Sequence, residues 1–63
     1  MTPAQEKMIL AKLRSPLNVN FIAHLLKCDV EKAQLEINSL IDKDLIVEYN
    51  PKIAKGYYVI KSL

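Results

Sequence analysis

The chain has 63 residues, a formal net charge of +2 and 51% hydrophobic residues. A chain this short forms one domain, buries only about 60% of its unfolded surface and is marginally stable alone. The single cysteine, Cys28, excludes an internal disulfide, and Cys28 with His24 gives too few soft ligands for a structural zinc site. We therefore keep a partner chain, including a second copy of this one, as an alternative source of stability.

The composition also limits the class of protein. No apolar run approaches the roughly 18 residues of a membrane-spanning helix. The first residues, Met-Thr-Pro-Ala-Gln-Glu-Lys, lack the basic start and apolar stretch of a secretory signal, so we expect a cytoplasmic protein with no membrane contact. With one His, one Cys, one Gly and no room for a deep pocket, we expect no enzyme, no metal, no cofactor and no small-molecule ligand.

The first predicted element is a helix over residues 3–14. Thr2 is a good N-cap, Pro3 suits the first helical position, and Gln5 completes a capping box. The pair Ser15-Pro16 ends the helix, because proline disfavours helical geometry in the residue before it. Its apolar residues include Met8, Ile9, Ala11 and Leu13. Any surplus apolar edge there, together with Leu63, is a candidate dimer contact.

Two further helices are predicted on either side of a tight connection. Asn18 caps a short helix over 19–26, in which Phe21, Ile22, Leu25 and Leu26 recur at helical spacing. Asp29 then caps a helix over 30–43, since its carboxylate suits a helix N-terminus. The apolar stripe of this last helix consists of Val30, Ala33, Ile37, Leu40 and Ile41, and Leu35 falls off it.

The end of the chain is typical of a β-hairpin. Residues 45–49 and 57–61 are rich in β-branched and aromatic side chains, which favours two strands. The loop between them, residues 50–56, carries the only glycine and is longer than most hairpin loops. Because side chains alternate along a strand, we expect one of Tyr57 and Tyr58 to pack inward. The predicted fold is therefore α+β, mostly α, with three helices followed by a two-stranded hairpin over 45–61.

The stretch Ile22-Ala23-His24-Leu25-Leu26-Lys27-Cys28-Asp29 resembles the helix-turn-helix core of winged-helix regulators. The continuation Ala33, Ile37, Leu40 and Lys43-Asp44-Leu45-Ile46-Val47 resembles the second helix of that family and the start of its wing. The similarity is to small prokaryotic or phage transcription regulators and covers nearly the whole chain. It implies that Ala23 allows a close helix crossing, and that Leu26 and Cys28 are buried beneath the turn.

Two positions depart from the family pattern. Lys27 stands where the turn usually has glycine, and Asp44 stands where glycine usually follows the last helix. Either place can require a left-handed backbone, which aspartate tolerates better than lysine. The departures affect the local geometry of the turns and leave the predicted fold unchanged.

The resemblance implies a set of DNA contacts. Helix 30–43 would enter the major groove, and wing loop 50–56 would lie on the DNA backbone or in the minor groove. Gln34 and Asn38 can each pair with adenine, Lys32 can reach guanine or phosphate, and Leu35 can contact a thymine methyl group. Asn18 and Asn20 would donate to phosphates. The full set is Asn18, Asn20, Glu31, Lys32, Gln34, Leu35, Asn38, Lys52 and Lys55.

The charge distribution keeps a second interpretation open. Residues 1–27 and 49–63 each carry net +3, whereas residues 28–48, which contain the groove-entering helix, carry net −4. Glu31 and Glu36 would approach phosphates unfavourably, and an exposed Leu35 suits a protein contact. The leading hypothesis is a regulator that binds double-stranded DNA. The alternative is a protein-interaction or dimerisation module that uses the acidic helix and Leu35.

Overall fold

Each helix begins at a side chain that accepts a backbone hydrogen bond, and all three caps are the predicted ones. Thr2 Oγ1 accepts from the Gln5 N–H at 3.1 Å, and Gln5 Oε1 accepts in return from the Thr2 N–H at 3.0 Å. Asn18 Oδ1 accepts from the Phe21 N–H at 2.9 Å. Asp29 Oδ1 accepts from the Lys32 N–H at 2.7 Å. The caps satisfy N–H groups that have no partner inside the helices, so they fix where the helices start.

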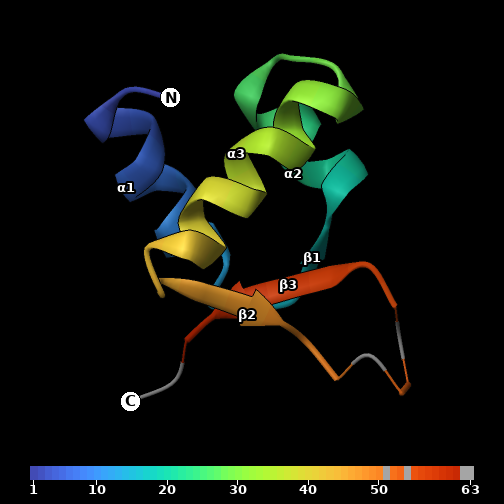
Figure 1. Cartoon of the computed structure of the whole chain (residues 1–63). Coiled ribbons are helices and arrows are strands. Elements are labelled where there is room, and N and C mark those ends of the chain that lie inside the picture. Colours follow the sequence, from blue (N-terminus) through green and yellow to red (C-terminus); the bar gives the residue numbers. More distant parts are fainter. Residues whose placement is uncertain (51, 54, 62–63) are drawn as a thin grey trace.

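The computed structural model describes residues 1–50, 52–53 and 55–61 and shows a small α+β domain, mostly helical (Figure 1). Its elements in chain order are α1 (Pro3–Lys12), β1 (Leu17–Asn18), α2 (Val19–Leu26), α3 (Val30–Asp42), β2 (Ile46–Glu48) and β3 (Tyr57–Ile60). Helix α2 has the predicted bounds, and α3 ends one residue early, which lies within the ambiguity of any helix end.

Helix α1 is two residues shorter than predicted, and the sheet explains the difference. The helix stops at Lys12, and Leu13 is its C-cap, with φ −77° and ψ 10°. The Leu13 carbonyl accepts a hydrogen bond from the Ile60 N–H at 3.0 Å. The carbonyl at the end of the helix is thus bonded to the end of β3 instead of to a further helical turn. The local sequence does not reveal this distant partner.

Among the described residues the sheet has three strands, rather than the predicted two. Its order is β1-β3-β2, and both pairings are antiparallel. The additional strand β1 pairs Leu17 with Tyr58 and Asn18 with Tyr57. Two residues are too few to show the alternation of apolar and polar side chains that identifies a strand. This segment is recognised as a strand only from its pairing with β3, which is distant in the sequence. In the hairpin, β2 and β3 are each slightly shorter than predicted.

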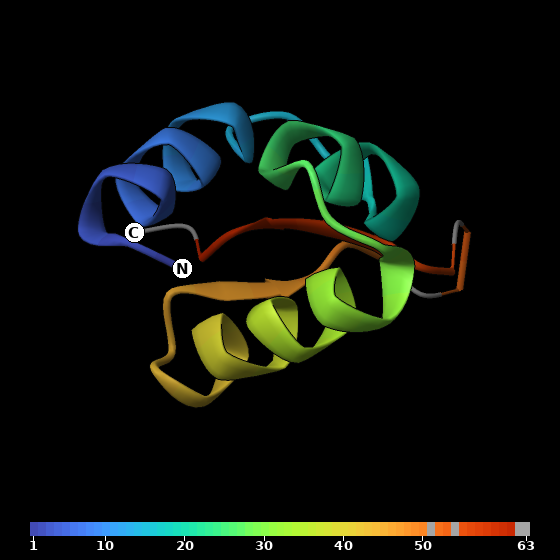
Figure 2. The ribbon, with the colours of Figure 1, turned by 90° about the horizontal axis from the view of Figure 1, so that it is seen from above.

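All three helices lie on one face of the sheet, and the core lies between them and the sheet (Figures 1 and 2). The buried residues come from α1 and its C-cap, from α2 and α3, and from β2. They are Ile9, Leu13, Ile22, Ala23, Ala33, Ile37, Leu40 and Ile46. Ala23 is 4% exposed and Ala33 is fully buried, which fits a close approach of α2 and α3.

Three residues predicted on apolar helix faces are exposed instead. Val30 and Ile41 are 44% and 39% exposed, and at 3.6 residues per turn both fall on the same flank of the α3 stripe. Phe21 is 49% exposed because it lies one residue, or about 100°, from buried Ile22. The stripe that reaches the core is narrower than the sequence pattern: on α3 it is Ala33, Ile37 and Leu40.

The sheet face away from the helices is apolar and open among the described residues. Ile46 is buried on the core face, whereas Val47 is 39% exposed on the opposite one. Tyr49 and Tyr57 continue that outer face, with the Tyr49 N–H donating to the Tyr57 carbonyl at 2.7 Å. Tyr58 points the other way and is packed against the core, which confirms that one of the two adjacent tyrosines turns inward.

Candidate functional site

One end of the molecule brings together the elements that carry the predicted contact residues. The N-termini of α2 and α3 and the loop between β2 and β3 lie at the same end of the molecule, and α1 begins at the other (Figure 2). The start of β3 joins these parts. Tyr57 pairs with Asn18 at the beginning of α2, and the Tyr58 hydroxyl is 3.5 Å from Gln34 Nε2 on α3.

At this end of the molecule, the N-terminus of α2 has no charged side chain in its first turn and offers several N–H donors. Its first turn carries neither Asp nor Glu. Asn18 uses its Oδ1 for the cap, which leaves the amide hydrogens on Nδ2 for another acceptor, and Asn20 is exposed. Free N–H groups and the positive end of the helix dipole favour an anion here.

The N-terminus of α3 has the opposite character. Asp29 caps it with a carboxylate, and Glu31 lies in the first turn. The face of α3 turned furthest from the core carries Glu31, Leu35, Asn38 and Asp42, all exposed and none of them cationic. Leu35 is 67% exposed, as expected for a residue off the apolar stripe. Lys32 is exposed on the flank of this face.

Gln34 and Asn38 are joined rather than independent. Gln34 Nε2 donates to Asn38 Oδ1 at 3.0 Å, one helical turn further on. The same Nε2 is 3.5 Å from the Tyr58 hydroxyl, a long hydrogen bond that reaches β3. Tyr58 is the member of this group that the sequence does not predict, because nothing local indicates that it faces α3.

The loop between β2 and β3 carries the two lysines predicted for the wing. Lys52 and Lys55 are both exposed, and Ile53 between them is 79% exposed. The Ile53 N–H donates to the Asn50 carbonyl at 3.0 Å, which closes a turn. Gly56 has φ +85°, a conformation that suits glycine, and its N–H is 3.4 Å from a carboxylate oxygen of Glu48. Residues 51 and 54 of the loop lie outside the described residues, as does Leu63.

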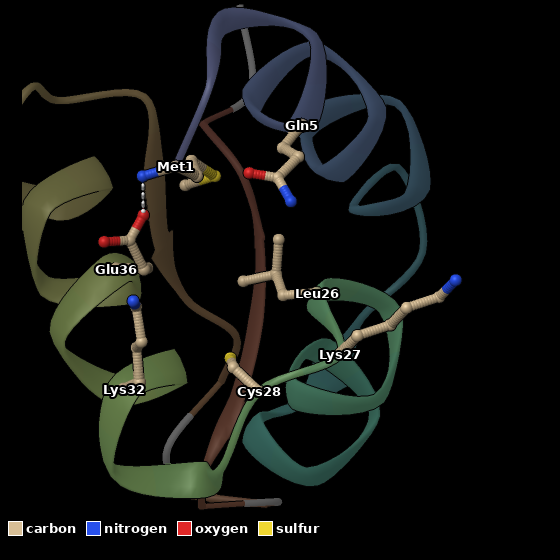
Figure 3. Close-up of a pocket in the computed structure, with 7 residues that line it drawn as sticks. All are labelled: Met1, Gln5, Leu26, Lys27, Cys28, Lys32 and Glu36. Atoms are coloured by element: carbon tan, nitrogen blue, oxygen red, sulfur yellow. Dashed lines mark hydrogen bonds and ion pairs between the residues drawn. The ribbon is translucent and has the colours of Figure 1, made fainter.

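A separate hollow of about 200 Å³ lies between α1, α3 and the turn after α2 (Figure 3). The Met1 amine and the Glu36 carboxylate meet across it at 2.5 Å. Cys28 and Leu26 point into it, whereas the Lys27 side chain extends away. The hollow is smaller than the sites that enclose drug-sized ligands. Leu26 and Cys28, both expected to be buried, are half-buried, because both line this hollow.

The described part of the chain contains no cluster of three metal-ligating side chains. None of its helices combines the length and the apolar character that crossing a bilayer requires. Comparison with protein-family models, with curated proteins and with solved structures found no match.

Proposed function

We propose that this chain is a winged helix-turn-helix domain that binds double-stranded DNA and acts as a small transcription regulator. The observation that carries the proposal is the convergence of the α2 and α3 N-termini and the hairpin loop at one end. A three-residue connection, Lys27–Asp29, separates α2 from α3, as a helix-turn-helix requires. In this proposal α3 is the recognition helix in the major groove, α2 lies across the DNA backbone, and loop 50–56 is the wing.

The phosphate contacts in this proposal come from α2 and the wing. Asn18 and Asn20 donate from the N-terminal turn of α2, which itself carries no carboxylate. Lys52 and Lys55 bring the positive charge, on the backbone or in the minor groove. With so few cations, we expect a shallow salt dependence, with the logarithm of the affinity falling by about 0.9 for each phosphate neutralised per tenfold rise in salt.

The base contacts come from the exposed side of α3. Gln34 and Asn38 supply amide groups, Leu35 supplies an apolar surface for a thymine methyl group, and Lys32 lies on the flank. Glu31 and Asp42 weaken the approach to any phosphate. We therefore expect low affinity for random DNA and a larger share of the binding energy from base contacts than from charge.

A fluorescence-anisotropy titration tests the proposal. The probe is a labelled duplex of random sequence, measured at a series of salt concentrations, with a single strand of equal length for comparison. We expect binding to the duplex at low salt that weakens as salt is raised. Absence of duplex binding at low salt, or binding that ignores salt, contradicts the proposal.

A protein-interaction module is the second candidate, and one observation favours it. Leu35 is 67% exposed on the acidic face of α3, where a DNA-binding helix usually carries polar or basic groups. Such a leucine suits a partner protein or a second copy of the chain. Sedimentation velocity across a concentration series tests self-association, which Leu35→Glu would abolish. A chain that stays monomeric and binds DNA argues against this candidate.

A further inference from the structure

The hydrogen bond between Gln34 and Asn38 changes what each side chain can offer a ligand. A side-chain amide has a carbonyl that accepts and an NH₂ group that donates twice. Gln34 Nε2 directs its hydrogens to Asn38 Oδ1 at 3.0 Å and to the Tyr58 hydroxyl at 3.5 Å. Its NH₂ group is therefore occupied, and Gln34 alone cannot form the two-bond pair with adenine that requires a free carbonyl and a free NH₂.

The two side chains together retain one free group of each kind. Gln34 Oε1 and Asn38 Nδ2 make no hydrogen bond within the described residues. The pair thus offers one acceptor and one donor, on residues one helical turn apart on α3. If both amides rotate by 180°, the bond between them reverses, and the pair still offers one donor and one acceptor. This property follows from the pairing and not from the orientation of either amide.

We propose that Gln34 and Asn38 act as a single composite reader of one adenine in the major groove, with Tyr58 as the residue that positions it. This inference rests on the proposed DNA binding and specifies the base that α3 selects. Adenine presents the N7 acceptor and the N6 donor side by side, which complements one donor and one acceptor. Guanine presents two acceptors, N7 and O6, so the free carbonyl of the pair would face another carbonyl.

Tyr58 belongs to the reader through its position rather than through contact with DNA. It is packed against the core on β3, and its hydroxyl meets the Gln34 NH₂ group. The hydroxyl thereby holds the Gln34 side chain in the conformation that also bonds Asn38. A conservative Tyr58→Phe change removes that hydrogen bond and keeps the ring, so base preference should weaken while the fold persists.

The test begins with selection from a random-sequence duplex pool, followed by titration of a labelled duplex of the selected sequence. We expect one adenine position whose replacement by guanine lowers affinity about tenfold, within the range for a bidentate pair. Gln34→Ala and Asn38→Ala should each weaken this preference at the same position. Because each change frees the remaining amide to pair with adenine by itself, the double variant should remove what is left of the preference. Replacing that adenine with 7-deazaadenine, which lacks the N7 acceptor, should weaken wild-type binding but not that of the double variant.

Asn20→Ala is the matched control, since it removes an exposed asparagine from α2 that we assign to a phosphate. It should lower affinity for every sequence equally and leave the adenine preference intact. The inference is overturned if Gln34→Ala and Asn38→Ala change preferences at two different positions, or if DNA binds without any dependence on either residue. Those outcomes leave the proposed DNA binding standing. Absence of duplex binding at low salt overturns both.

Discussion

Lys27 and Asp44 share a left-handed backbone, with φ of 56° and 64°, and each lies where a core helix gives way to the next element. After α2, the Lys27 N–H donates to the Ala23 and His24 carbonyls. After α3, the Leu45 N–H donates to the Leu40 carbonyl at 3.1 Å. These bonds satisfy carbonyls at the helix ends, which is the role of a left-handed residue that follows a helix. The sequence indicates that either position can require this backbone, since each stands where the family that the chain resembles usually has glycine, and both positions adopt it.

Lys27→Gly should stabilise the protein, because glycine removes the steric strain of a β-carbon in this conformation. The strain relieved is about 1–2 kcal/mol, and the greater freedom of glycine in the unfolded chain offsets part of it. A net gain of about 0.5–1 kcal/mol would raise the thermal midpoint by several degrees. Thermal unfolding followed by circular dichroism measures the shift.

Asp44→Gly is the matched comparison. Aspartate tolerates the left-handed region better than lysine, and Asp44 also forms an ion pair with Lys61 Nζ at 2.5 Å. Both partners are largely exposed, so the pair contributes little. We expect a change close to zero for Asp44→Gly. A larger gain at position 44 than at position 27 would contradict this account of the two turns.

Ile37→Ala and Leu35→Ala should differ sharply although they lie two residues apart on α3. Ile37 is fully buried among the core residues, and a large-to-alanine change in a core costs about 2–5 kcal/mol. That loss is a large fraction of the stability of so short a chain, so Ile37→Ala should be mostly or wholly unfolded. Leu35→Ala should stay within about 0.5 kcal/mol of wild type. Urea unfolding decides between these outcomes, and equal losses would show that α3 is oriented differently.

A structural feature is predictable from the sequence when the residues that determine it are close together in the chain. Thr2, Asn18 and Asp29 cap helices through hydrogen bonds only three residues away, so the helix starts are predictable. Strand β1 and the end of α1 depend on β3, through the pairing of Leu17 with Tyr58 and the Ile60–Leu13 hydrogen bond. These partners are distant in the chain, so neither feature has a local signature.

The candidate site shows the same division. Asn18 is identifiable from its cap position, and the lysines are identifiable from their place in the hairpin loop. The bond between Gln34 and Asn38 has the spacing of neighbours on a helix, i and i+4, so the sequence permits it without requiring it. The Tyr58 hydrogen bond with Gln34 depends on which face of β3 meets α3, and that is fixed by the sheet register. The sequence thus supplies the residues, and the tertiary pairing decides which of them contact one another.

Glu31→Gln should strengthen DNA binding a few-fold, because it removes a negative charge from the exposed face of α3. The same change should cost about 0.3–1 kcal/mol of stability, since Glu31 lies in the first turn, where its charge is attracted to the positive end of the helix dipole. Glu6→Gln is the control, because Glu6 also lies in a first turn, on α1. It should lower stability by a similar or slightly larger amount, since Glu6 also pairs with Lys43 Nζ at 3.3 Å, and leave DNA binding unchanged. Equal effects of both variants on affinity would show that only net charge matters.

Replacing Lys52 and Lys55 together by alanine should weaken binding to every DNA sequence and flatten its salt dependence. Both lysines are exposed in the loop. For each phosphate that is no longer neutralised, the magnitude of the slope of log affinity against log salt should decrease by about 0.9. Anisotropy titrations at several salt concentrations give the slope. Lys7→Ala with Lys12→Ala is the control, since it removes the same charge from α1, which begins at the opposite end of the molecule and carries none of the proposed contacts. If the two double variants flatten the slope equally, the loop makes no direct phosphate contact and the wing is misassigned. If only the loop variant does so, the positive charge acts from the end of the fold where α2, α3 and the hairpin loop converge.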